Sequence, residues 1–124
     1  KVIEGTVNAF FEEFTNLWHN NRQGILFPKF LYEDQDQSTD YALNLVLKHI
    51  LNDAISVCGI EMHRRCLSLA HNADFEQIED ITLRAKLEAR NLLLGRELIL
   101  YSDSIKEISN LTSLALKFNE RNIL

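Results

Sequence analysis

The chain has 124 residues, of which 46% are hydrophobic and 25% charged, as in an ordinary globular domain. Its 13 basic and 18 acidic side chains leave a formal net charge of −5 without a basic run, which argues against nucleic acid and anionic membranes, because clustered Lys and Arg hold phosphates. Three glutamates lie in the first twenty residues and no uninterrupted apolar stretch approaches a membrane span, so we expect no signal peptide and a cytoplasmic protein.

Apolar residues at helical spacing predict a first helix over residues 3–19, with one face formed by Phe10, Phe14, Leu17 and Trp18. The polar run that ends in Gly24 should stop it, because Asn and Gly tolerate left-handed backbone. We expect residues 24–37 to form a loop whose aromatic side chains pack onto the body.

The longest predicted helix begins at a cap formed by Ser38, Thr39 or Asp40 and continues to about residue 71. Gly59 stands inside it at a cost of about 1 kcal/mol relative to Ala, so we expect another segment to approach closely there. The apolar residues of this helix recur at positions i, i+3, i+4 and i+7. They are Leu43, Val46, Leu47, Ile50, Leu51, Ala54, Ile55, Cys58, Met62, Cys66, Leu69 and Ala73.

Two further helices are predicted. Asp80 or Thr82 begins the third, which ends near Tyr101, and the spacing of Ser104 and Glu107 predicts a capping box for the fourth. The expected fold is therefore all-α, a bundle of about four helices in one domain over residues 1–124. The residues expected to be buried are Phe14, Trp18, Leu47, Ile50, Leu51, Cys58, Met62, Leu69, Leu87 and Leu94.

An arginine pair, Arg64 and Arg65, lies within the long predicted helix. A guanidinium keeps its proton at any working pH, so its burial requires an anionic or oxygen-rich partner. At about 100° per residue, Arg65 falls near the centre of the apolar stripe and Arg64 on its flank. A purely structural alternative is that Arg65 pairs with Glu61, four residues earlier, or extends along apolar surface with its charged end in water.

The two cysteines, Cys58 and Cys66, would be about 12 Å apart on one helix, too far for a disulfide. We expect them to be reduced, in an apolar setting that raises their pKa. Glu61 and His63 are two residues apart and face different sides of a helix, which disfavours a metal site. His71 either caps the helix or joins the arginines, and the residues predict neither a catalytic constellation nor a metal site.

Residues 58–80 read CGIEMHRRCLSLAHNADFEQIED. This segment resembles the C-terminal helical region of methylthioribose kinases, in which a Met and a hydrophobic residue precede two arginines, followed by an Ala-His step, an acidic-aromatic turn and Ile-Glu-Asp. Residues 10–18 and 26–28 resemble the family's aromatic-rich helix and the loop after it, and residues 83–98 resemble its closing helix. The likeness covers residues 7–100.

The sequence also departs from the family pattern. His63 replaces the usual Ile before the arginine pair, the glycine before the Ala-His step is replaced around Ser68 and Leu69, and residues 102–124 match nothing in the pattern. The arginine pair itself is intact.

The resemblance implies an enzyme that transfers the γ-phosphate of ATP, with magnesium, to the 1-hydroxyl of 5-methylthioribose in methionine salvage. It implies that Arg64 and Arg65 bind the sugar, and that the protein is a dimer. Enzymes of this kind have a nucleotide lobe, a Gly-rich phosphate loop, a His-Gly-Asp catalytic loop and a magnesium-binding acidic motif. None can be written from this sequence, so we expect a C-terminal fragment that is inactive without the remaining kinase lobe.

The alternative is a stand-alone helical interaction or dimerisation domain without catalysis. In that case Glu61, His63 and the arginines would only satisfy one another through internal hydrogen bonds. A Gly-rich loop and a His-Gly-Asp motif in the gene upstream of Lys1 would distinguish the two hypotheses.

Overall fold

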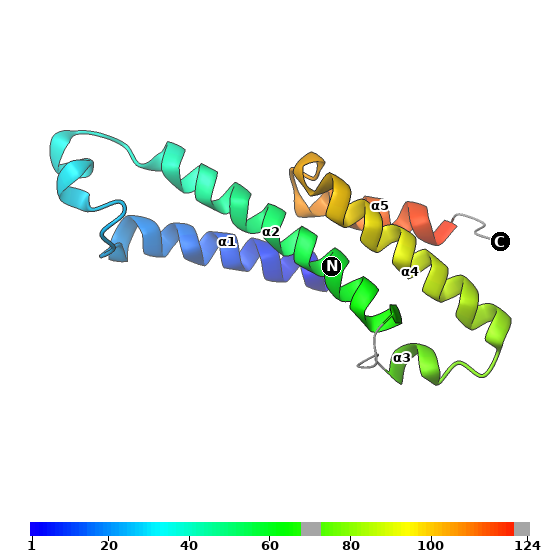
Figure 1. Ribbon diagram of the computed structural model, residues 1–124. Coiled ribbons are helices and arrows are strands. Elements are labelled where there is room, and N and C mark those ends of the chain that lie inside the picture. Colours follow the sequence, from blue (N-terminus) through cyan, green and yellow to red (C-terminus); the bar gives the residue numbers. More distant parts are fainter. Residues whose placement is uncertain (68–72, 121–124) are drawn as a thin grey trace. The chain divides into compact units, whose positions relative to one another are not determined.

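A computed structural model describes residues 1–67 and 73–120, and all regular structure in these ranges is helical (Figure 1). The prediction of an all-α fold with four main helices is confirmed. The described chain forms two compact units, residues 1–50 and 51–124, and α2 runs from the first into the second. The helices are α1 (Val2–Asn21), α2 (Asp40–Leu67), α3 (Ala73–Glu76), α4 (Ile81–Tyr101) and α5 (Ile108–Glu120), with short 3₁₀ helices η1 (Lys29–Leu31), η2 (Glu33–Gln35) and η3 (Ser102–Ser104).

The predicted helix starts are correct for α2 and α4. Ser38 Oγ accepts a hydrogen bond from the backbone N–H of Asp40 at 3.1 Å. Asp80 caps α4, because its carboxylate accepts from the N–H groups of Thr82 (2.9 Å) and Leu83 (3.1 Å). The predicted end of the long helix near residue 71 lies outside the described residues.

The predicted capping box at Ser104 is wrong, because α5 begins only at Ile108. The Ser104 hydroxyl instead donates to the carbonyl oxygen of Tyr101 at 2.6 Å, at the end of α4. The Glu107 N–H donates to Asn110 Oδ1 at 3.2 Å, which is the side-chain-to-N–H half of a capping box placed three residues later than expected. Ser104 thus closes one helix rather than opening the next, and η3 lies between the two.

Aromatic side chains join α1 to the loop after it. The ring centroids of Phe10 and Phe14 are 5.8 Å apart, those of Phe14 and Trp18 6.1 Å, and those of Trp18 and Phe27 5.2 Å. Tyr32 extends the row at 6.2 Å from Phe27. The expectation that the aromatic residues of the loop pack onto the body is therefore met for Phe27 and Tyr32 but not for Phe30, which is 62% exposed. The loop itself contains η1 and η2.

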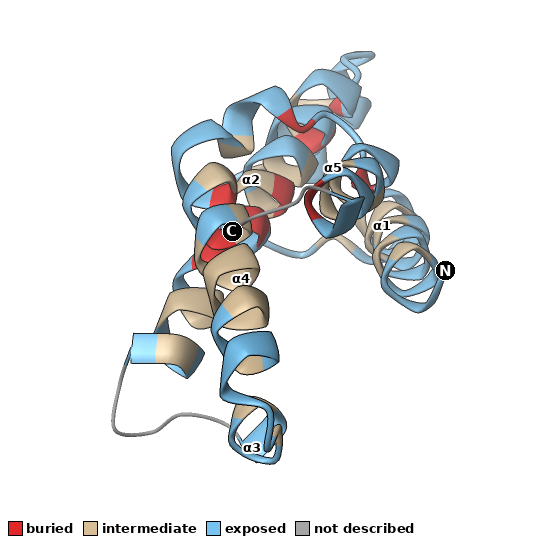
Figure 2. Cartoon of the chain, turned by 90° about the vertical axis from the view of Figure 1, so that its right-hand side faces the viewer, coloured by how far each residue is buried: buried red, intermediate tan, exposed pale blue. Residues whose placement is uncertain are grey.

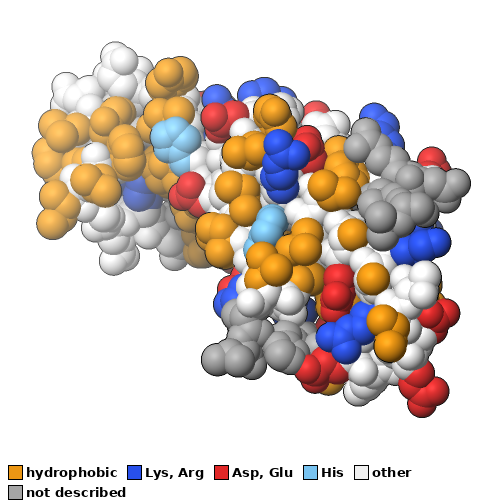
Figure 3. All heavy atoms as spheres, turned by 45° about the vertical axis from the view of Figure 1, so that its right-hand side comes forward, with side chains coloured by type: hydrophobic (Ala, Val, Ile, Leu, Met, Phe, Trp, Pro, Cys, Tyr) orange, Lys and Arg blue, Asp and Glu red, His pale blue; other side chains and the backbone are white. Residues whose placement is uncertain are grey.

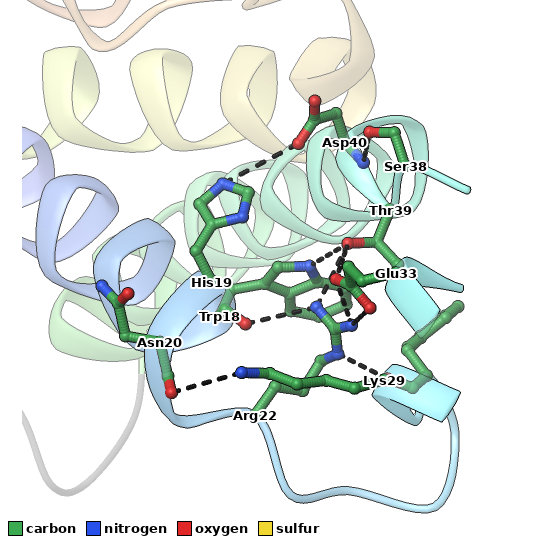
Figure 4. A network of polar contacts seen from close by, with 10 residues as sticks. Trp18, His19, Asn20, Arg22, Lys29, Glu33, Ser38, Thr39 and Asp40 are labelled. Atoms are coloured by element: carbon green, nitrogen blue, oxygen red, sulfur yellow. Dashed lines mark hydrogen bonds and ion pairs between the residues drawn. The ribbon is translucent and has the colours of Figure 1, made fainter. Parts of the chain in front are cut away.

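Arg22 organises the same loop through a network of polar contacts (Figure 4). Its guanidinium donates to both carboxylate oxygens of Glu33 at 2.5 and 2.6 Å, to Thr39 Oγ1 at 3.1 Å and to the carbonyl oxygen of Phe27. It also stacks 5.1 Å above the Trp18 ring, whose Nε1 donates to Thr39 Oγ1 at 3.0 Å. The Arg22 side chain is only 6% exposed, so one charged group links the end of α1, the loop and the start of α2.

This network predicts an acid-sensitive contact. The hydrogen bond from Arg22 lowers the pKa of Glu33 below its ordinary value of 4.5. A carboxyl whose pKa is lowered by folding stabilises the fold above its unfolded pKa and loses that contribution as the pH falls through the folded pKa. We expect Trp18 fluorescence to report loosening of the loop below about pH 4.5.

A Glu33→Gln variant should show a smaller change of Trp18 fluorescence over this pH range, because its side chain does not titrate. The exposed neighbour Asp34 provides a matched control, and Asp34→Asn should keep the acid profile of the original chain. Identical acid profiles for the Glu33→Gln variant and the original chain would contradict the prediction.

The core of the second unit lies where α2, α4 and α5 contribute their buried residues, shown in red in Figure 2. Ile55 and Leu98 are 2% and 1% exposed. Gly59 on α2 and Gly95 on α4 meet at the closest approach, where a Cβ added to Gly59 would lie 2.5 Å from the carbonyl oxygen of Gly95. The expectation that another segment approaches Gly59 is confirmed. The other buried apolar residues of this unit are Leu51, Ile105, Ile108 and Phe118.

Predicted burial is only partly correct. Leu51 is buried, Cys58 is exposed, and Leu69 lies outside the described residues. The reason is that α2 is covered on fewer sides than a fully buried helix, so most of its stripe is only half shielded. The remaining residues predicted to be buried are half-buried, namely Phe14, Trp18, Leu47, Ile50, Met62, Leu87 and Leu94.

The partial exposure of α2 bears on the expectation that the chain has no membrane-spanning stretch. Among the described residues, α2 is long and apolar enough to cross a membrane by length and composition, with a mean hydropathy of 1.3 over an 18-residue window that is 22% buried. The expectation that no uninterrupted apolar stretch approaches a membrane span still holds for α2, because Lys48 and Asp53 interrupt its apolar residues. Core helices of soluble proteins also meet these two criteria, so the criteria alone do not assign α2 to a membrane.

Candidate functional site around the arginine pair

Arg64 lies in the last turn of α2 and is held by Glu61 of the same helix. Its Nε is 3.0 Å from both carboxylate oxygens, and its Nη2 is 2.7 Å from Oε2. Both side chains are 44% exposed. The hydrogen bonds lower the pKa of Glu61 and raise the pKa of Arg64. The flank position predicted for Arg64 is thus an exposed, charge-paired position.

The place of Arg65 in the apolar stripe predicted that its side chain points into the core, and this prediction is wrong. The Arg65 side chain is 47% exposed, and Nη1 lies 3.7 Å from Asp74 Oδ2 on α3. Of the two structural alternatives, the pair with Glu61 is not formed, since Arg64 bonds the Glu61 carboxylate. The other, an arginine with its charged end in water, agrees with the exposure of Arg65. Arg65 stays exposed because α2 meets α4 through Gly59, Met62 and Cys66, and not along its full apolar face.

A hollow of about 360 Å³ lies beside Arg65. It brings one guanidinium together with two carboxylates, an amide, a thiol and two apolar side chains, whereas Arg64 is not among its lining residues. This surface offers both donors and acceptors to a small polar molecule. The lining residues are Cys58, Glu61, Met62, Arg65, Asp74, Phe75 and Asn91.

A second, more apolar hollow of about 240 Å³ shares Met62, Phe75 and Asn91 with the first. Residues of α4 and α5 line the rest of it, including Leu87, Leu94 and Phe118. The three shared side chains therefore separate a polar hollow from an apolar one.

The cysteines and His63 contribute less chemistry. Both cysteines are free, in agreement with the prediction. Desolvation raises the pKa of the Cys58 thiol although the residue is exposed overall, and the charge of Arg65 opposes this shift. His63 Nδ1 lies 2.9 Å from the carbonyl oxygen of Gly59, so the ring belongs to the α2–α4 contact.

His71 lies outside the described residues, so its role is not described. Among residues 1–67 and 73–120 there is no group of three His, Cys, Asp or Glu side chains able to hold a metal ion.

Curated proteins named methylthioribose kinase are similar to this chain. One from Escherichia coli is 32% identical over 108 residues, or 87% of the chain, and one from Bacillus cereus is 35% identical over 106 residues, or 86% of the chain. One from Yersinia pseudotuberculosis is 34% identical over 91 residues, or 68% of the chain. The chain is homologous to a segment of methylthioribose kinases.

The matched segment is a minor part of those methylthioribose kinases. The chain spans 26% of the Escherichia coli protein, 24% of the Bacillus cereus protein and 22% of the Yersinia pseudotuberculosis protein. No family model matches the chain, and no solved structure matches it.

The structure adds two residues that the sequence analysis did not single out, Asp74 and Asn91. Asp74 lies on α3, a four-residue helix too short to produce a periodic signal. Asp74 lies in the acidic-aromatic turn of the methylthioribose kinase pattern, and this position is the sequence feature that could have identified it as a site residue. Asn91 lies on the α2-facing side of α4, one helical turn before Gly95. A polar residue on this otherwise apolar side is a sequence feature that could have identified Asn91.

Proposed function

We propose that this chain is the C-terminal helical portion of an enzyme that phosphorylates the 1-hydroxyl of 5-methylthioribose with ATP. The observation that carries the proposal is the 32–35% identity, over about 86% of the chain, to proteins named methylthioribose kinase. ATP and magnesium would bind to the rest of that enzyme. The 124 residues would supply part of the sugar site and a helical body that supports it.

The surroundings of Arg65 support a role in binding the sugar. Its guanidinium is half exposed in the polar hollow, and its carboxylate partner Asp74 lies at 3.7 Å, beyond hydrogen-bonding distance. A ligand can therefore bond Arg65 without displacing a tight pair. Guanidinium N–H groups donate to sugar oxygens and stabilise negative charge that develops during phosphoryl transfer, and nearby carboxylates accept from hydroxyl groups.

Arg64 has a different relation to a ligand. Glu61 occupies its donors through hydrogen bonds of 2.7 to 3.0 Å, so a ligand at Arg64 competes with this carboxylate. We assign Arg64 to the sugar site with Arg65, as the family resemblance implies. Its positive charge acts on the ligand over a longer distance unless Glu61 moves.

Gene context and one assay test the proposal. The longer reading frame should encode a Gly-rich phosphate loop and a His-Gly-Asp motif upstream of Lys1, and its product should phosphorylate 5-methylthioribose in the presence of ATP and magnesium. A reading frame without these motifs, or a full-length product without this activity, would refute the proposal. Such a result would favour the helical interaction domain.

Exposed apolar side chains predict association when the rest of the enzyme is absent. In the loop after α1, Ile25 and Leu26 are 95% and 84% exposed, and Phe30 is 62% exposed. Figure 3 shows hydrophobic side chains, in orange, at the surface of the viewed face. Unpaired apolar surface of this kind favours association. We expect sedimentation velocity to show dimers or larger species that increase with concentration.

An Ile25→Ser, Leu26→Ser double variant should shift this equilibrium towards the monomer, because it removes apolar surface without touching the Arg22 network. Gln23→Ser, in the same loop, is the matched polar control. A chain that remains monomeric at several hundred micromolar would contradict the prediction.

A further inference from the structure

We propose that Asn91 is a positioning residue that fixes the turn of α2 carrying Arg64 and Arg65. Its Nδ2 donates to the carbonyl oxygen of Met62 at 2.7 Å and lies 3.1 Å from Cys66 Sγ. These two partners lie on either side of the arginine pair in sequence. The contact between Asn91 and α2 does not depend on any ligand. Only the statement that the turn presents the arginines to a sugar rests on the proposed function.

The orientation of the Asn91 amide follows from its partner. A backbone carbonyl can only accept, so the group that faces Met62 must be the NH₂ of the amide and not its oxygen. In an α-helix the same carbonyl also accepts from the N–H four residues later, which belongs to Cys66. Asn91 therefore bonds α2 at a carbonyl within its regular ladder, without breaking the helix.

The neighbouring contacts cannot perform this task alone. Gly59 and Gly95 let the two backbones approach, because a Cβ on Gly95 would lie 2.8 Å from His63 Nδ1 and one on Gly59 would lie 2.5 Å from a carbonyl oxygen. Glycines set the distance between helices but have no side chain that resists sliding or rotation. A directional hydrogen bond from Asn91 supplies that resistance one turn away.

The location of Asn91 connects this contact to the site. Asn91 lines the polar hollow together with Arg65, and it also lines the apolar hollow. If the residue 62–66 turn rotates about the α2 axis, the Arg65 guanidinium moves relative to Asp74 and the walls of the hollow. Asn91 thus fixes the position of the Arg65 guanidinium and need not contact the ligand itself.

Amide hydrogen exchange measured by NMR on the 124-residue chain tests the inference without a ligand. Asn91→Leu keeps the approximate shape of the side chain and removes its donor. We expect exchange of the backbone N–H groups of residues 64–67 to become about 3-fold to 10-fold faster, the range for losing one hydrogen bond. Exchange in residues 51–58 should stay unchanged. Asn91→Gln, which keeps a donor, should restore part of the protection.

Asn52→Leu provides the matched control, because Asn52 also lies on α2 and donates to Asp103 Oδ1 at 2.6 Å. It should leave exchange at residues 64–67 unaltered. Equal acceleration along all of α2 in Asn91→Leu, or none, would overturn the inference. If Asn91→Leu does not fold, the same comparison of residues 64–67 with 51–58 in Asn91→Ala, which also removes the donor, decides it. If the full-length protein has no kinase activity, only the proposed function is refuted, since the exchange experiment requires no substrate.

Discussion

Replacement of Arg65 by Met in the full-length enzyme should lower kcat/KM for 5-methylthioribose by about 10²–10³, the scale for removing one preorganised charge-stabilising group. The reason is the exposed guanidinium in the polar hollow, which has no tight partner to compensate for its loss. Arg64→Met should lower kcat/KM by less than Arg65→Met does, because Glu61 already holds Arg64 and Arg64 does not line the hollow. The KM for ATP should change little in both variants. Steady-state kinetics with each substrate varied in turn measures these effects.

Arg96 offers a matched control for both substitutions. It is an exposed arginine on α4 that lines neither hollow, so Arg96→Met should retain the original kcat/KM. Thermal unfolding of the same variants separates a binding role from a structural one. Because Arg65 is 47% exposed, Arg65→Met should have little effect on the melting temperature. A lowered melting temperature with normal turnover would contradict the assignment of Arg65 to the sugar site.

Sequence reasoning succeeded where a local signal is strong. The periodic apolar positions, the Asp80 cap and the glycine inside a long helix each follow from short-range chemistry, and the structure contains all three. The four main helices follow from the same signals. Ser104 shows the limit, because a capping-box pattern does not reveal that the hydroxyl is already bonded to Tyr101 at the end of the preceding helix.

The candidate site was less accessible to sequence reasoning because it depends on contacts between helices. The position of Arg65 in the apolar stripe suggested burial, but stripe position equals burial only if a neighbour covers the whole stripe. Here α4 crosses α2 at Gly59, and Asn91 meets the next turns, so Arg65 remains outside. Asp74 and Asn91 come from α3 and α4, and only the fold brings them to Arg65.

The α2–α4 crossing should respond strongly to added volume. Gly59→Ala places a Cβ 2.5 Å from the carbonyl oxygen of Gly95 and 2.9 Å from Ile99 Cγ1. The first neighbour is backbone, so the two helices must separate, and the surrounding Ile55 and Leu98 lose contact. Overpacking of this kind typically costs about 1–3 kcal/mol, even though Ala favours a helix more than Gly does. Gly95→Ala should also destabilise the chain, because its Cβ would lie 2.8 Å from His63 Nδ1 and 3.0 Å from the carbonyl oxygen of Gly59.

Gly5 supplies a control with the opposite expected sign. It lies in α1, and nothing lies within 4 Å of a Cβ added there. Gly5→Ala should therefore raise the free energy of unfolding by about 0.5–1 kcal/mol through helix propensity alone. Urea unfolding followed by circular dichroism measures all three variants under identical conditions. If Gly59→Ala and Gly95→Ala stabilise the chain as Gly5→Ala does, the helices do not cross at these glycines in solution, and the support that the crossing gives to the arginine-bearing turn is lost with it.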